Sequence, residues 1–209
     1  MKAIYQLMTH PRVYLGIQRA LGADRLRKLC LEEFVQPQSG ERILDIGCGP
    51  GYILEHLPAV DYVGFDTEVK YIDYAKARYA GRGSFYCEVL STRHAEYFEP
   101  FDVALLFGLL HHLPDREADD LLGLTARCLK PGGRAVTLDP CFTPEQSIIA
   151  RYVAQNDRGR FVRTANAYDA LARAHFIDVS AVTVHNVCRI PSTERILRLR
   201  KPVLVKGPI

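Results

Sequence analysis

A short apolar segment that leads directly into a glycine-rich loop constrains the fold of this chain more than any other feature. Residues 43–51 read ILDIGCGPG, so a predicted strand over 41–46 is followed by glycine at every second position. Glycine permits positive φ and lets a ligand approach the main chain closely. A helix after such a loop would present free N–H groups to that ligand. The segment therefore predicts a strand, a ligand-binding loop and a helix, as in α/β proteins.

Strands and helices then alternate along the chain. Further strands are predicted at residues 62–65, 85–89, 101–107 and 134–138, and helices at 11–21, 24–35, 68–80, 114–129, 144–156 and 167–174. This alternation favours an α/β fold with a parallel sheet. The last two predicted strands, 179–184 and 194–199, leave no room for a crossover helix between them, so we expect them to pair antiparallel.

Composition and length exclude several classes of protein. The 209 residues are 48% apolar and 24% charged, which is typical of a globular chain and suits a single domain. No apolar run approaches the roughly 20 residues that a membrane span needs, and no sustained apolar stretch follows the N-terminal lysine. The six cysteines form no C-x-x-C pair, so we expect free thiols in a cytoplasmic protein and no metal site.

A second acidic residue strengthens the ligand-binding interpretation. Asp66 ends the strand after the loop, 21 positions beyond Asp45. A carboxylate at that place can accept two hydrogen bonds from a ribose diol. A tight turn with a capping aspartate would explain either feature alone, but their combination at this spacing favours a bound nucleoside.

The loop differs from a dinucleotide-binding loop. Tyr52 occupies the position where such loops need glycine or alanine for close packing of strand and helix. The carboxylate of Asp45, directly before the loop, would repel a phosphate and favours a cationic group such as an ammonium or a sulfonium. A nicotinamide-dependent oxidoreductase is therefore the weakest of the functions considered.

Four segments in this order and spacing resemble the class I S-adenosylmethionine-dependent methyltransferases, most closely those that act on small molecules. The segments are ILDIGCGPG at 43–51, VGFD at 63–66, FDVALLFGLLHHLPD at 101–115 and LKPGGRAVTLDP at 129–140. The resemblance covers about residues 40–140. It implies S-adenosylmethionine as cofactor and a Rossmann-like sheet of seven strands, mostly parallel with an antiparallel last strand, with helices on both faces.

The resemblance also implies cofactor-binding residues at the carboxyl ends of the strands. It places Asp45, Gly47, Cys48, Gly49 and the backbone near Phe107 along the methionine part, Asp66 and Thr67 at the ribose, and Glu88 and Val89 beside the adenine. The family often has Gly-Asp where this chain has Cys87 and Glu88. A glutamate can still accept a hydrogen bond from the adenine amino group.

Two histidines follow the predicted strand 101–107, at the sheet edge where open α/β folds bind ligands. With an ordinary pKa of about 6.5, His111 or His112 is a candidate for removing a proton from the methyl acceptor. Alternatively, a histidine caps the next helix or packs beneath the cofactor, since many methyl transfers rely on positioning. Adjacent residues entering a helix point about 100° apart, so we expect at most one of the two to face the acceptor.

Candidate acceptor-binding residues lie near both ends of the chain. Tyr5 and Tyr14 belong to an N-terminal helical region that in this family often covers the pocket as a lid, although a core role for either is equally compatible with the sequence. Three arginines surround a predicted turn, namely Arg158, Arg160 and Arg163. They form a candidate clamp for a carboxylate or phosphate, and the alternative is a helix end with cations that suit its dipole.

We expect one domain with three parts: a helical lid over 1–36, a cofactor-binding half over 37–140, and an acceptor side with a terminal hairpin over 141–209. Residues 151–209 hold 11 Lys and Arg against 4 Asp and Glu, whereas residues 1–150 hold 16 against 20. The basic part is either a solvated edge or a region that attracts an anionic partner.

The predicted function is methyl transfer from S-adenosylmethionine to a small molecule, with an anionic acceptor among the options and O-, N- and C-methylation all open. A nucleic-acid or protein methyltransferase is an alternative. We disfavour nucleic acid because the sequence has no Asn/Asp-Pro-Pro-Tyr motif for a flipped base. A protein that binds S-adenosylmethionine without catalysis is the other alternative.

Overall fold

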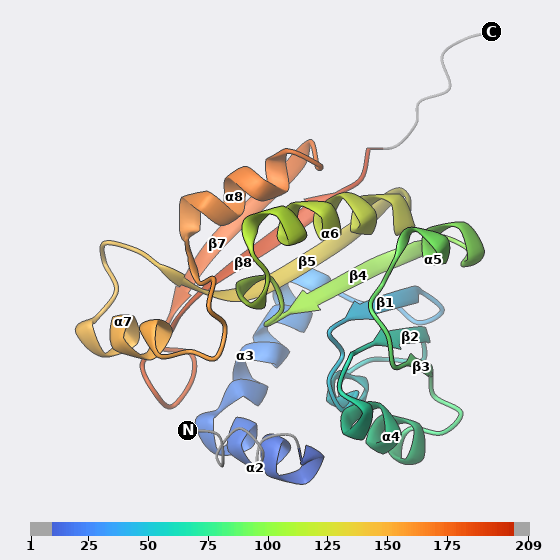
Figure 1. The fold of residues 1–209 in the computed structure, drawn as a ribbon, viewed down its shortest axis with the longest axis horizontal. Helices are drawn as coiled ribbons and strands as arrows, with labels where there is room; N and C mark the ends of the chain where they lie inside the picture. The colour runs from blue at the N-terminus through green and yellow to red at the C-terminus, as the bar shows by residue number, and fades with distance from the viewer. Residues whose placement is uncertain (1–9, 203–209) are drawn as a thin grey trace, which may run out of the picture.

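The computed structural model describes residues 10–202, which form one layered α/β fold around a central sheet (Figure 1). The strands are β1 (Arg42–Ile46), β2 (Asp61–Phe65), β3 (Ser84–Tyr86), β4 (Phe101–Phe107), β5 (Leu129–Phe142), β6 (Arg163–Thr164), β7 (Asp178–His185) and β8 (Thr193–Arg200). The α-helices are α2 (Pro11–Leu21), α3 (Ala23–Cys30), α4 (Val69–Arg78), α5 (Thr92–Tyr97), α6 (Asp115–Cys128), α7 (Ile148–Gln155) and α8 (Ala165–Arg173). No helix within the described range is long and apolar enough to cross a membrane.

The sheet has the strand order β3-β2-β1-β4-β5-β8-β7, and the two-residue strand β6 pairs with β5 outside this path. Strands β1 to β5 pair in parallel. Strand β8 runs antiparallel to both β5 and β7. The expected mostly parallel sheet with an antiparallel last strand is therefore confirmed, and so is the terminal antiparallel pair.

Two apolar clusters, one on each face, hold the helices against the sheet. Figure 1 shows α5, α6 and α8 on one face and α2, α3 and α4 on the other. One cluster includes Leu122 of α6 and Tyr168 of α8, and the other includes Cys30 of α3 and Ile72 of α4. Strand β4 contributes to both, because alternate side chains of a strand point to opposite faces.

Three local expectations were wrong. The helix after the glycine loop is only the single 3₁₀ turn η2 (Tyr52–Glu55), because Pro58 closely follows and disfavours helical backbone at the residue before it. Strand β3 ends at Tyr86, three residues before the predicted end. Gly22, with φ of 80°, closes α2 and begins α3, so Asp24 is not the cap; α3 then continues as the π-helical turn η1 (Leu31–Val35).

Candidate functional site

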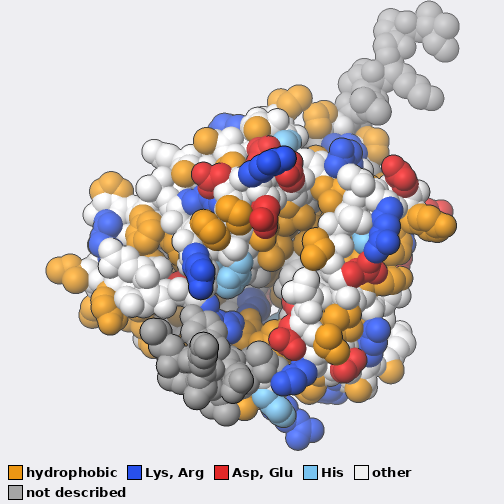
Figure 2. Space-filling model, viewed as in Figure 1, with side chains coloured by type: hydrophobic (Ala, Val, Ile, Leu, Met, Phe, Trp, Pro, Cys, Tyr) orange, Lys and Arg blue, Asp and Glu red, His pale blue; other side chains and the backbone are white. Residues whose placement is uncertain are grey.

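Two adjoining cavities lie at the carboxyl ends of the parallel strands. The larger has a volume of about 420 Å³, and the smaller, beside the glycine loop, about 50 Å³. Tyr14, Arg27 and Phe107 line both cavities and so form their common wall. Figure 2 shows a hollow in this face of the molecule, with basic and histidine side chains at its rim.

The glycine loop has the backbone that the sequence predicts. Gly47 and Gly49 have φ of 77° and 54°, which L side chains rarely adopt. A Cβ atom on Gly49 would meet no atom within 4 Å, so open space adjoins the main chain there. The amides of Gly47 and Cys48 both donate to the carbonyl of Phe65, which fixes the loop against β2. The loop therefore offers a rigid, accessible main-chain surface to a ligand.

Asp45 lies at the base of the loop and lines the smaller cavity. Its Oδ2 accepts a hydrogen bond of 2.6 Å from the hydroxyl of Tyr62. Burial raises the pKa of Asp45 to about 7, although this hydrogen bond opposes the shift. A cationic group placed nearby would stabilise the ionised carboxylate.

Asp66 joins the loop to the entrance of α4. Its Oδ2 accepts from the amide of Gly49 at 2.8 Å, and its Oδ1 accepts from the amide of Glu68 at 2.8 Å. A carboxylate has about four acceptor sites and the main-chain amides use at most three, so the same side chain can order the loop and accept from a ribose hydroxyl. The following residue, Thr67, is exposed. Burial raises the pKa of Asp66, and the three main-chain amides that it contacts oppose the rise.

The two residues expected beside an adenine lie beyond β3. Glu88 forms an ion pair with Arg93 and lies 3.4 Å from Nε2 of His94. Val89 is 69% exposed. Neither lines one of the two cavities, so their contact with adenine stays a prediction.

His111 is held between two carboxylates. Its Nδ1 lies 2.7 Å from Oδ1 of Asp139, and its Nε2 lies 3.2 Å from Oδ1 of Asp157. Burial opposes the charged imidazole, but the hydrogen bonds with Asp139 and Asp157 outweigh it and raise the pKa to about 9. Each ring nitrogen faces a carboxylate oxygen, and with this raised pKa the imidazolium form is favoured at neutral pH. An imidazolium has no free lone pair, so this geometry does not suit a general base.

Gly159 allows the loop after α7 to pack directly on this imidazole. A Cβ atom on Gly159 would lie 1.8 Å from Cδ2 of His111. The amide of Phe161 also donates to the carbonyl of His111 at 2.9 Å. The histidine therefore fixes the loop that carries the candidate arginines.

His112 is exposed and lines the larger cavity. Its ring lies 4.2 Å from that of His111, measured between centroids. Partial burial lowers its pKa, and the charge of His111 lowers it further. His112 is therefore neutral at neutral pH, with a lone pair available to accept a proton.

The structure does not bring the three candidate arginines to one cavity. Arg158 lines the larger cavity, with its guanidinium carbon 6.0 Å from the centroid of the Tyr14 ring, whereas Arg160 is exposed and outside the cavity. Arg163 is buried and pairs with Asp115 at 2.8 Å. It also donates to the carbonyls of Leu110, Leu113 and Phe161.

The three-arginine clamp is therefore wrong for Arg163, whose donors are used within the fold. Tyr14 lies on the common wall of the cavities, in a helix that partly covers them. The other candidate tyrosine, Tyr5, lies outside the described residues.

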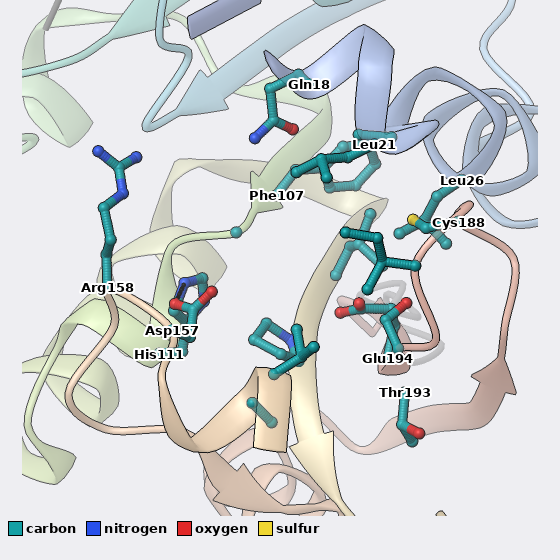
Figure 3. A pocket seen from close by; sticks show the side chains of 18 of the residues that line it. Gln18, Leu21, Leu26, Phe107, His111, Asp157, Arg158, Cys188, Thr193 and Glu194 are labelled. Carbon is teal, nitrogen blue, oxygen red and sulfur yellow. Dashed lines mark ion pairs between the residues drawn. The ribbon is translucent and has the colours of Figure 1, made fainter. Parts of the chain in front are cut away.

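Four residues that the sequence did not single out complete the site. These are Arg27 on α3, Asp139 on β5, Asp157 after α7 and Glu194 on β8. Figure 3 shows His111 and Asp157 together on one side of the larger cavity and Glu194 on the other. Asp139 and Asp157 lie 28 and 46 positions beyond His111, so no local spacing connects them. Asp157 belongs to the turn that the candidate arginines surround, and this turn is the one local signal for it in the sequence.

Comparison with known proteins assigns this chain to a family. Residues 43–133 match the family described as a methyltransferase domain. A ubiquinone biosynthesis O-methyltransferase of Sinorhizobium medicae is 31% identical over 147 residues, which are 68% of this chain and 58% of that protein. Phosphoethanolamine N-methyltransferase 3 of Arabidopsis thaliana is 32% identical over 149 residues, 68% of this chain and 30% of that protein.

Solved structures share the fold at lower identity. Phosphoethanolamine N-methyltransferase 2 of Haemonchus contortus, in complex with S-adenosyl-L-methionine, has a TM-score of 0.64 and 19% identity, covering 85% of this chain and 52% of that one. The [4+2]-cyclase SpnF has a TM-score of 0.66 and 20% identity, covering 87% and 82%. A cyclase among these neighbours shows that the fold alone does not fix the reaction.

The chain belongs to the class I S-adenosylmethionine-dependent methyltransferase family. It spans a little over half the length of the ubiquinone biosynthesis O-methyltransferases that it matches.

Proposed function

We propose that the protein transfers a methyl group from S-adenosylmethionine to a small molecule bound in the larger cavity. One observation carries this proposal: the cavity at the glycine loop and the larger cavity share a wall made of Tyr14, Arg27 and Phe107. A methyl donor bound at the loop and a methyl acceptor bound in the larger cavity would therefore lie next to each other at these three residues. Such placement converts a bimolecular reaction into a step between two held groups.

The residues at the loop fit the cofactor. Open space beside Gly49 admits a ligand against the main chain, and Asp66 retains an acceptor site for a ribose hydroxyl. Asp45 presents a buried carboxyl group toward the smaller cavity, which suits the ammonium of the methionine part. When bound, the cofactor supplies a methyl group on a sulfonium.

The cofactor needs more room than the smaller cavity encloses. Its volume of about 50 Å³ is far below the roughly 300–1,000 Å³ of ordinary ligand pockets. Among the 11 residues of α2, only Pro11 and Leu15 are buried. We propose that this loosely packed helix moves outward when the cofactor binds, as the expected N-terminal lid would.

The larger cavity suits a small acceptor. Its volume of about 420 Å³ lies in the range of small-molecule pockets. Its walls are mostly apolar, with polar groups concentrated around His111 and at Glu194. The curated relatives are named for O-methylation in ubiquinone biosynthesis and N-methylation of phosphoethanolamine, which supports a hydroxyl or an amine as the methyl-accepting group.

Within this site we assign different roles to the two histidines. His111, ion-paired on both sides, positions the loop over the cavity. His112 is neutral and lines the cavity, so it is the candidate to accept a proton from the acceptor. Positioning of the acceptor without a base remains the competing mechanism.

Transfer of a labelled methyl group tests the function. The protein is incubated with S-adenosylmethionine carrying a deuterated methyl group and, separately, with extracted metabolites, total RNA and denatured protein. Mass spectrometry should find the label in the metabolite fraction. Label in RNA or protein would favour the macromolecular alternative, and cofactor binding without label in any fraction would favour a non-catalytic protein.

A further inference from the structure

The larger cavity contains an acidic side chain that the proposed methyl transfer does not use. Glu194 lies near the start of β8, where its backbone is paired with Pro140 of β5 and Val184 of β7. Pro140 also lines the cavity. The sheet thus fixes the backbone that carries this carboxyl group. Figure 3 shows the group across the cavity from His111 and Asp157.

The position of Glu194 is one where the strand pattern would place an apolar side chain. Glu194 and Ile196 point to the same face of β8, because side chains alternate along a strand. Ile196 is fully buried in the cluster beneath α3. Glu194 extends this face into the cavity, where Leu26 and Cys188 lie beside it (Figure 3).

Glu194 is half-buried, and no lysine or arginine within residues 10–202 forms an ion pair with its carboxyl group. Removing the charge even partly from water without a counter-ion is costly. Burial raises the pKa of Glu194 to about 7. A hydrogen bond with Ser192 opposes this rise. The charges of Asp139 and Asp157 add to the rise, and the charge of His111 opposes it. A bound molecule that donates a hydrogen bond to the carboxyl group would remove part of this cost.

We infer that Glu194 selects the methyl acceptor by accepting a hydrogen bond from its hydroxyl or ammonium group, at the end remote from His111 and Asp157. This inference rests on the proposed function, since it concerns the acceptor of that reaction. A carboxylate or phosphate at the same end of the acceptor would be repelled by Glu194. The substrate class is therefore a small, mostly apolar molecule with a neutral or cationic hydrogen-bond donor distant from the methylated atom.

Three probes of similar size separate the possible charges. They are 2-phenylethanol, 2-phenylethylammonium and 3-phenylpropanoate, which share a phenylalkyl body and differ in the terminal group. Binding is measured by calorimetry at pH 8, where Glu194 is mostly ionised and His111 mostly protonated. The wild-type protein should bind the alcohol and the ammonium at least about tenfold more tightly than the carboxylate, the scale of one hydrogen bond to a charged group.

Glu194→Gln keeps the size of the side chain and removes its charge. It should reduce this preference to less than about threefold, the part that a neutral hydrogen bond retains. Glu145→Gln, at an exposed position outside the cavity, is the matched control and should keep the wild-type preference. Circular dichroism of both variants checks that they remain folded.

Tighter binding of 3-phenylpropanoate by the wild type, an unchanged preference in Glu194→Gln, or no binding of any probe would overturn the inference. All titrations are made with and without S-adenosylhomocysteine. Failure of S-adenosylhomocysteine itself to bind would count against the proposed function, whereas the order of the probes on the cofactor-free protein still decides the role of Glu194.

Discussion

Nδ1 of His111 lies 2.7 Å from Oδ1 of Asp139, a carboxylate that is 1% exposed. The same carboxylate oxygen also accepts the main-chain amide of His111 at 3.1 Å. The turn after β4 is thereby tied to β5, and Asp157 ties the loop after α7 to the other side of the ring. A histidine that the sequence offers as a base is thus an ion-paired element of the cavity wall.

The first prediction concerns stability at alkaline pH. The pKa of His111 is raised to about 9 in the folded protein, from about 6.5 in the unfolded chain. Its contribution is fully present below pH 6.5, decreases as the pH rises and is lost above about pH 9. The free energy of unfolding in urea should therefore fall between pH 6 and pH 10 by about 3 kcal/mol more in the wild type than in His111→Gln.

Titration of Asp157 does not contribute to the change in stability between pH 6 and pH 10. Its pKa is lowered, despite burial, by the hydrogen bond with His111, so its contribution is lost only when acid protonates it, below the measured range. The titration of the His111 ring by NMR gives an independent reading in the wild type. A midpoint below pH 7 would contradict the ion-paired arrangement.

The second prediction separates a base from a positioning residue at His112. If His112 accepts the proton, His112→Ala should lower kcat by about 10²–10⁴-fold with little change in the affinity for S-adenosylhomocysteine. His175→Ala is the matched control, because His175 pairs with Asp119 and does not line the cavity. A decrease in kcat of less than tenfold, or a pH–rate profile unaltered by the substitution, would show that His112 is not a general base.

The third prediction concerns the ribose carboxylate. Asp66→Ala should weaken S-adenosylhomocysteine binding by about 1.5–3 kcal/mol, the scale of hydrogen bonds to a charged group. Asp61→Ala, at the exposed start of β2, removes a surface pair with Arg42 and should leave the affinity unchanged. Calorimetry with both variants, and with NAD as the ligand expected not to bind, checks this. Equal affinities in the two variants would make Asp66 only a structural link.

The fourth prediction distinguishes the arginines. Arg163→Ala should lower the free energy of unfolding by about 2–4 kcal/mol, because it leaves the buried carbonyl of Leu110 and the partly buried carbonyl of Leu113 without this donor. Arg158→Ala should leave stability unchanged but raise the KM for the acceptor, since Arg158 lines the cavity. Arg160→Ala should alter neither. An unaffected KM in Arg158→Ala would remove Arg158 from the acceptor site.

The positions of the main strands and of the glycine loop follow from local sequence. The strand ending at Asp45, the glycines after it and the apolar strand over 101–107 each carry their own pattern, and all appear where expected. The predicted ends of helices were less accurate where a single residue determines where the helix stops. At Tyr52 the expected helix is one 3₁₀ turn, a difference that depends on the nearby Pro58 and not on periodicity.

The acceptor side could not be read from the sequence in the same way. Asp139 and Glu194 lie within strands and carry no local motif. Asp139 matters because β5 brings it to His111, and Glu194 because β8 brings it to the larger cavity. Arg163 is the opposite case, because the sequence predicts a ligand contact and the structure shows contacts within the fold. Its sequence context suggests an anion site, but contacts with Asp115 and three carbonyls, all distant in sequence except Phe161, make it structural.

A crystal structure with bound S-adenosylhomocysteine tests the central claim most directly, because it locates the sulfur atom relative to the two cavities. The account predicts the ribose hydroxyls at Asp66, the methionine part along Gly47 and Gly49, and the sulfur facing the larger cavity beside Phe107. A ligand bound away from the glycine loop, or a sulfur atom separated from the larger cavity by the protein chain, would contradict it.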